Sequence, residues 1–223
     1  MNKTFSFVAL DFRLIKPYRI SILLLLILGI VMGGWAKSVS TLSSYFMVSL
    51  MLIVSYPFSI SDKNGLDTLY STLALKRKTV VIGRYLFVLI LEVIFIILAF
   101  ICSLALSIVT KTEFILSEML FILSMLSCIF SLVIAIQYPI YFKYGYNKAK
   151  ILSLVPLFIV FLAIIQLPTL AKLFNFNFSW DTIITIIMKN TFLIYIVPVV
   201  LGLILLAFSC SMSCKIYTKR DLV

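Results

Sequence analysis

Six long stretches almost free of charge constrain this chain more than any other feature. They are Ile20–Ala36, Ser38–Ser61, Tyr85–Thr110, Met119–Phe142, Ile151–Ala171 and Asn190–Cys214, with Glu92 as the one charged residue inside them. A helix crosses the hydrocarbon core of a bilayer with about 20 apolar residues. The runs are continuous and rich in Leu, Ile and Phe, whereas the strands of a membrane barrel alternate over short segments. The sequence therefore predicts an all-α integral membrane protein with six transmembrane helices in a single domain, residues 1–223.

The predicted spans cover about 20–36, 39–61, 82–110, 115–142, 151–171 and 191–214, and the basic residues orient them. With the N-terminus inside, the inner segments hold 15 of the 19 Lys and Arg residues, and the outer segments hold Lys37, Lys111, Lys172 and Lys189. Short cytoplasmic loops are enriched in Lys and Arg, so both termini are expected in the cytoplasm. The net charge of +11 then faces anionic lipid headgroups, and nucleic acid is not an expected partner.

The segment before the first span, 1–19, combines basic residues with an apolar stripe. Four apolar residues recur at spacings of three or four: Phe5, Val8, Phe12 and Ile15. This pattern predicts an amphipathic elbow helix that lies in the cytoplasmic interface of the membrane. Pro17 is expected to end it before the chain enters the bilayer. An unstructured basic tail is the alternative.

The residue types that carry enzyme chemistry are largely missing. The chain has no histidine, which excludes HExxH metalloproteases, histidine-dependent triads and histidine metal ligands. It has no GxxxxGK[ST] loop, so this chain is not expected to hydrolyse ATP by the P-loop route. Cys102, Cys128, Cys210 and Cys214 all fall in predicted spans and are expected to be small buried apolar residues. No catalytic residue, metal site or bound cofactor is therefore predicted in this chain.

The inner segment 62–80, between the second and third spans, carries the densest pattern. Gly65 permits a turn, and Asp67 is suited to cap a short helix. The apolar residues of that helix share one face: Leu66, Leu69, Tyr70 and Leu73. The basic cluster Lys76-Arg77-Lys78 follows. Such a helix either enters a groove on a soluble partner or rests on lipid, and the pattern alone does not separate the two.

The order of residues in this segment resembles the cytoplasmic signature of ABC-2-type transporter permeases. The matching residues are Asp62, Lys63-Asn64-Gly65, Leu69 to Leu73, Lys76-Arg77-Lys78, Val80-Val81 and Gly83-Arg84-Tyr85-Leu86. The elbow helix, the six spans and an apolar outer segment between the last two spans agree with that family. One departure is that Leu73-Ala74-Leu75 stands where the family commonly has Leu-Pro before the basic cluster.

The resemblance implies a type V exporter-like architecture and a transport subunit without its own motor. Such permeases pair as homodimers or heterodimers with a second or paralogous permease, and they dock on ABC ATP-binding subunits that hold ATP and Mg²⁺. By this resemblance the ATPase-coupling residues are Asp67, Leu69, Tyr70, Leu73, Lys76 and Arg77, with Lys148 in the second inner loop as a lesser contact.

Glu92 is the one acidic residue deep in a predicted span. Ionisable groups at such depth are costly and are often functional. It is expected to face polar groups such as Gln137, Gln166 or Tyr138, where it either binds a cationic substrate or forms structural hydrogen bonds.

The permeases that this chain resembles include those of phenol-soluble-modulin exporters and antimicrobial-peptide resistance systems. The expected function is outward export of an amphipathic or antimicrobial peptide, or another hydrophobic substrate, across the bacterial cytoplasmic membrane. Two alternatives are the substrate-binding membrane subunit of an energy-coupling vitamin importer, and a bacteriocin-immunity or scaffold protein without transport. The segment 62–80 counts against the vitamin importer.

Overall fold

The computed structural model describes residues 3–66, 70, 76–111, 114–155, 158 and 191–219, and every regular element in that part is helical. The elements are α1 (Lys3–Ile15), η1 (Lys16–Tyr18), α2 (Arg19–Ala36), α3 (Val39–Lys63), α5 (Arg77–Thr110), α6 (Leu116–Tyr144), α7 (Tyr146–Ala149), η2 (Leu152–Leu154) and α10 (Thr191–Lys219). Among these residues, five helices are long and apolar enough to span a membrane: Thr4–Ala36, whose apolar part is α2, and then α3, α5, α6 and α10. The prediction of a helical multi-pass membrane protein is confirmed. The expected span at 151–171 lies almost entirely outside the described residues.

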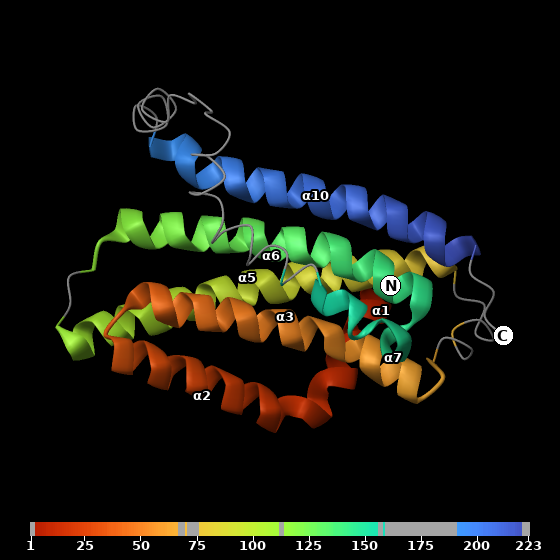
Figure 1. Ribbon diagram of the computed structural model, residues 1–223, viewed down its shortest axis with the longest axis horizontal. Coiled ribbons are helices and arrows are strands. Elements are labelled where there is room, and N and C mark those ends of the chain that lie inside the picture. Colours follow the sequence, from red (N-terminus) through yellow and green to blue (C-terminus); the bar gives the residue numbers. More distant parts are fainter. Residues whose placement is uncertain are drawn as a thin grey trace.

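The long helices lie side by side in one bundle (Figure 1). α2 and α3 form an antiparallel pair, joined through Lys37 in the left-handed region at φ 47°. Their backbones approach closely at Gly33, where a Cβ atom would lie 2.6 Å from Leu42 Cβ. Small residues permit this distance between membrane helices.

α10 packs along α6, and the two helices are parallel. Gly202 faces Ser131, the hydroxyl of Ser209 bonds the carbonyl of Ala135, and the ring of Tyr217 lies 5.3 Å from that of Phe142. Residue numbers therefore rise in the same direction along both helices. Parallel neighbours need a connection that returns to the starting end of the bundle.

Pro139 interrupts the backbone ladder of α6 and explains one of these contacts. A proline has no N–H, so the carbonyl four residues earlier, that of Ala135, loses its helical donor. Ser209 Oγ of α10 donates to this carbonyl at 2.7 Å. The hydroxyl of Tyr85 on α5 lies 2.6 Å from Ser209 Oγ and 2.9 Å from Ser213 Oγ. A chain of hydrogen bonds thus joins α5, α6 and α10 where water is scarce.

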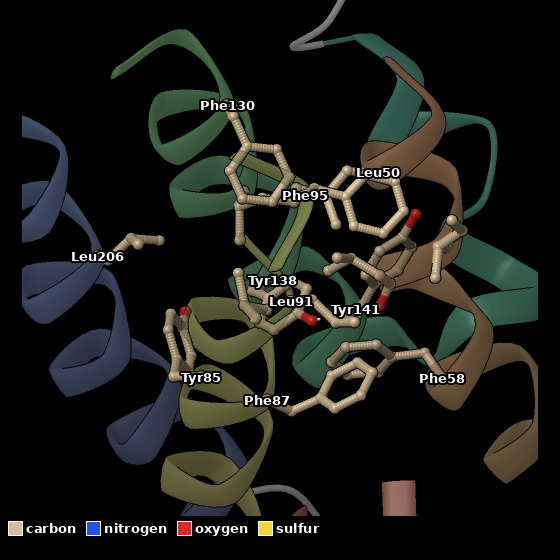
Figure 2. Close-up of a cluster of buried hydrophobic side chains, with 14 of the residues drawn as sticks. Leu50, Phe58, Tyr85, Phe87, Leu91, Phe95, Phe130, Tyr138, Tyr141 and Leu206 are labelled. Atoms are coloured by element: carbon tan, nitrogen blue, oxygen red, sulfur yellow. Dashed lines mark hydrogen bonds between the residues drawn. The ribbon is translucent and has the colours of Figure 1, made fainter. Parts of the chain in front are cut away.

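The core lies between α3, α5 and α6 and is rich in aromatic side chains (Figure 2). The ring of Phe58 lies 4.9 Å from that of Tyr138 and 5.1 Å from that of Tyr141, and Tyr85 lies 5.1 Å from Tyr138. Edge and tilted arrangements of this kind are favourable for aromatic pairs. By contrast, α2 and α10 expose large apolar side chains on their outer faces. This distribution suits a bundle surrounded by lipid.

Candidate functional site

Basic side chains gather at the end of the bundle that holds α1 and α7, here called the basic end. α3 and α10 finish there, and α5 begins there (Figure 1). Its described basic residues include Arg13, Lys16, Arg19, Lys63, Lys76, Arg77, Lys78, Arg84, Lys143, Lys148, Lys150, Lys215 and Lys219. Lys37 and Lys111 follow α2 and α5 at the opposite end. The charge asymmetry expected from the sequence is therefore present in the described structure.

Four of the seven predicted coupling residues are described: Tyr70, Lys76, Arg77 and Lys148. The other three, Asp67, Leu69 and Leu73, lie outside the described residues. Lys76 and Lys148 are exposed, as a docking surface requires. Tyr70 is instead 3% exposed, and its side chain faces the interior of the protein.

Phe7 of α1 lies between Tyr70 and the start of α5. The two rings meet edge-on with centroids 5.3 Å apart. On the other side of Phe7, a Cβ atom at Gly83 would lie 2.6 Å from Phe7 Cδ1. α1 also contacts α5 through Phe12 and Phe87, whose ring centroids are 4.9 Å apart. α1, the predicted elbow helix, thus connects Tyr70 of the predicted coupling segment to α5 by direct contact.

The inward face of α1 differs from the stripe that spacing alone suggested. Phe7, Val8 and Ile15 are buried together with Asp11, whereas Phe5 is 60% exposed. The cause is contact with protein: α1 packs against α5 and α3, so packing rather than the lipid surface selects the buried face.

Arg77 stabilises the end of α10. Its Nη1 donates to the carbonyls of Tyr217 at 3.3 Å and Thr218 at 3.0 Å. The last carbonyls of a helix lack partners within the helix and carry partial negative charge, which suits a guanidinium. Arg77 therefore links the start of α5 to α10.

Arg84 is the most deeply buried basic side chain in the described part of the chain. It is 2% exposed, its Nη2 donates to Ser61 Oγ, and its Cζ lies 4.0 Å from the centroid of the Phe58 ring. A cation over an aromatic face is stabilised by the ring quadrupole. Arg84 is therefore fixed between α3 and α5.

Asp11 on α1 is fully buried and faces the charge of Arg84. Burial raises the pKa of its carboxyl from 3.8 to about 6, although the positive charge of Arg84 lowers it. Neither carboxylate oxygen has a hydrogen-bond partner among the described residues. The sequence alone predicts no role for Asp11. Its position in the sequence gives one signal: Asp11 is four residues from both Phe7 and Ile15, so on a helix it shares a face with these two apolar residues.

Glu92 and Gln137 have separate partners in the structure. Ser127 Oγ on α6 donates to Glu92 Oε1, and Gln137 Nε2 donates to the carbonyl of Ser153 at 2.8 Å. Tyr138 donates to the carbonyl of Val54 at 3.2 Å. Gln166 lies outside the described residues. Ser127, which sequence reasoning did not single out, is therefore the contact of Glu92 in the described structure.

The two inner connections are tied to each other. Asp62 Oδ2, at the end of α3, accepts a hydrogen bond from the backbone N–H of Asn147 at 2.8 Å. The chain reaches Asn147 through Gly145, whose φ of 75° favours glycine. Lys148 is therefore held beside the start of the predicted coupling segment. Among the described residues, no three His, Cys, Asp or Glu side chains gather to hold a metal ion.

Comparison with known families decides the class of the protein. A family model described as an ABC-2 family transporter protein matches residues 6–218. The chain belongs to the ABC-2 transporter family. No curated protein and no solved structure matches it. The ABC-2 permease is a membrane subunit for transport, and its family implies an ABC ATP-binding partner and a dimeric arrangement.

The signature Gly83-Arg84-Tyr85 of this ABC-2 permease has a physical role at each position. Gly83 leaves room for Phe7, Arg84 is fixed over Phe58, and Tyr85 bonds two serines of α10. One turn of α5 thus joins α1, α3 and α10.

Proposed function

We propose that this ABC-2 permease exports an amphipathic or antimicrobial peptide outward across the bacterial plasma membrane. ATP and Mg²⁺ bind a separate ATP-binding subunit, and two permease chains, identical or paralogous, form the transport path. The observation that carries the coupling assignment is the contact of Phe7 with both Tyr70 and Gly83. A displacement of the coupling segment reaches α5 through this ring because packed side chains move together.

The proposed topology has six spans with both termini in the cytoplasm. Two observations support it: the basic residues gather at one end of the bundle, and α6 and α10 are parallel. Parallel neighbours require a connection that crosses the membrane again.

The coupling surface is tested by copurification with the cognate ATP-binding subunit. Lys76→Glu combined with Lys148→Glu reverses two exposed charges at the basic end, and loss of the ATP-binding subunit is expected. The matched control is Lys37→Glu combined with Lys111→Glu, which changes charge equally at the opposite end and should leave copurification intact. Equal retention by both double variants would contradict the coupling assignment.

The cargo is tested by protection of cells against a cationic amphipathic helical peptide. Expression with the ATP-binding subunit should lower intracellular accumulation of a labelled peptide, and a scrambled peptide of the same composition should not be exported. Equal export of both peptides, or export of neither, would refute the peptide assignment. The two alternatives are separable because vitamin binding or protection by sequestration should persist in cells that lack the ATP-binding subunit.

A further inference from the structure

A groove at the basic end lies on the outside of the seam between α6 and α10. Its volume is about 590 Å³. The described lining residues are Pro139, Ile140, Lys143 and Tyr144 from α6, and Met212, Ile216 and Lys219 from α10. Met212 and Tyr144 remain 49% and 44% exposed. The groove is therefore an open surface of the described bundle rather than part of its core.

Two apolar stripes lead into this groove along the parallel helices. On α10, Ile204, Phe208 and Met212 are exposed at intervals of four residues, and Ile216 continues the stripe. Residues four apart lie on one face of a helix. On α6, Ile136 and Ile140 form the shorter stripe.

Both stripes end in a lysine at the basic end of the bundle. Lys143 terminates the α6 stripe, and Lys219 terminates the α10 stripe. Lys143 Nζ lies 4.9 Å from the centroid of the Tyr144 ring, which holds this ammonium group at the rim of the groove. The C-terminal ends of α6 and α10 carry partial negative charge, which disfavours an anion. The attraction for an anion at this place therefore comes from the two lysine side chains.

This arrangement matches an amphiphile with an anionic head and a hydrocarbon tail. From Phe208 to Lys219 the helix rises about 16 Å at 1.5 Å per residue. Half of a bilayer's hydrocarbon core is about 15 Å thick. A lipid whose phosphate lies between the lysines would therefore extend its acyl chain along the stripe of α10. Lysine at the membrane surface and apolar side chains below it complement both parts of such a molecule.

We infer that the α6–α10 groove binds an anionic phospholipid of the leaflet at the basic end. The phosphate lies between Lys143 and Lys219, and an acyl chain covers Ile140, Met212 and Ile216. The site is separate from the coupling surface and does not depend on the peptide cargo. It requires only that the helices span a membrane.

The test is native mass spectrometry of the full chain in mixed micelles. The probes are phosphatidylglycerol and phosphatidylcholine with the same acyl chains, at equal concentrations. The wild type should retain phosphatidylglycerol preferentially. Lys143→Gln combined with Lys219→Gln should lower that affinity about thirty-fold, because each basic side chain near an anionic lipid contributes about a factor of five. Met212→Asn, which keeps both lysines, should also weaken retention.

The matched control is Lys150→Gln combined with Lys215→Gln. Both residues are exposed at the same end and neither lines the groove among the described residues, so retention should be unchanged. Equal loss in the control and the groove variant would overturn the site, as would equal retention of the two lipids by the wild type. Displacement of the lipid by millimolar inorganic phosphate would overturn the assignment to a lipid. Efficient cross-linking of Met212→Cys between two copies in native membranes would show that protein covers the groove.

Discussion

Asp11→Asn tests whether the buried carboxyl of Asp11 on α1, which faces Arg84, destabilises the folded chain when it is ionised. Because burial raises the pKa of Asp11 to about 6, the folded chain holds its proton more tightly than the unfolded chain, whose carboxyl titrates near 3.8. Below pH 3.8 both states are protonated and the carboxyl adds no penalty. Above pH 6 both are ionised, and the buried carboxylate destabilises the folded chain. Each pKa unit corresponds to about 1.4 kcal/mol, so this penalty reaches about 3 kcal/mol at pH 7.5 and about 1 kcal/mol at pH 4.5.

Asparagine keeps the size of the side chain and removes its ionisation. Its own polar cost does not change with pH, so the informative quantity is how the difference in unfolding free energy between the variant and the wild type varies with pH. That difference should shift by about 2 kcal/mol in favour of Asp11→Asn between pH 4.5 and pH 7.5. Other carboxyl groups titrate in both proteins and cancel. The assay is SDS titration of the purified chain in mixed micelles, followed by far-ultraviolet circular dichroism.

Arg84 supplies the second arm of this experiment. Its positive charge lowers the Asp11 pKa, so Arg84→Gln should raise that pKa and enlarge the pH-dependent gain from Asp11→Asn. A difference between wild type and Asp11→Asn that stays constant from pH 4.5 to pH 7.5 would refute the reasoning. It would mean that the carboxyl reaches water in the folded chain.

Three further changes probe the contacts around the start of α5. Gly83→Ala places a Cβ atom against Phe7 and should lower the unfolding free energy by about 1–3 kcal/mol. This loss should be smaller in the Phe7→Leu background. An equal loss in both backgrounds would mean that the added methyl group does not clash with Phe7. Ser209→Ala removes the donor to the Ala135 carbonyl and should lower the unfolding free energy by about 1 kcal/mol. In the Pro139→Ala background the loss should be smaller, because alanine restores the backbone N–H that bonds this carbonyl. Equal losses in the two backgrounds would contradict this account. Glu92→Gln keeps an oxygen that accepts from Ser127, so stability should be retained, and full export activity in this variant would rule out a transport role for the carboxylate.

The class of fold and the distribution of charge were predictable because they depend on local composition. A run of about 20 apolar residues requires a helix in lipid wherever it later packs. The basic residues also indicate on which side each loop lies, and in the described part of the chain all of them except Lys37 and Lys111 lie at one end.

The partners of individual polar side chains were not predictable from spacing. Ser127 is one of several serines in α6, and only the relative rotation of α5 and α6 selects it as the contact of Glu92. Ser209 reaches Ala135 because α10 is parallel to α6, which no local pattern encodes. The burial of Asp11 was not predictable either. An acidic residue beside apolar residues is normally expected at the surface, and its burial is explained only by Arg84, which faces it from another helix.

The proline in α6 also bears on how this permease changes shape. An interior proline gives a helix a joint, and bending at a joint normally exposes a bare carbonyl to hydrocarbon. Here the hydroxyl of Ser209 already bonds that carbonyl, so a bend of α6 at Pro139 would avoid this cost as long as the bond is kept. To keep this bond, α10 would have to move with α6. In such a bend the parts of α6 and α10 beyond Pro139 would move together, and Lys143 and Lys219 would keep their relative positions.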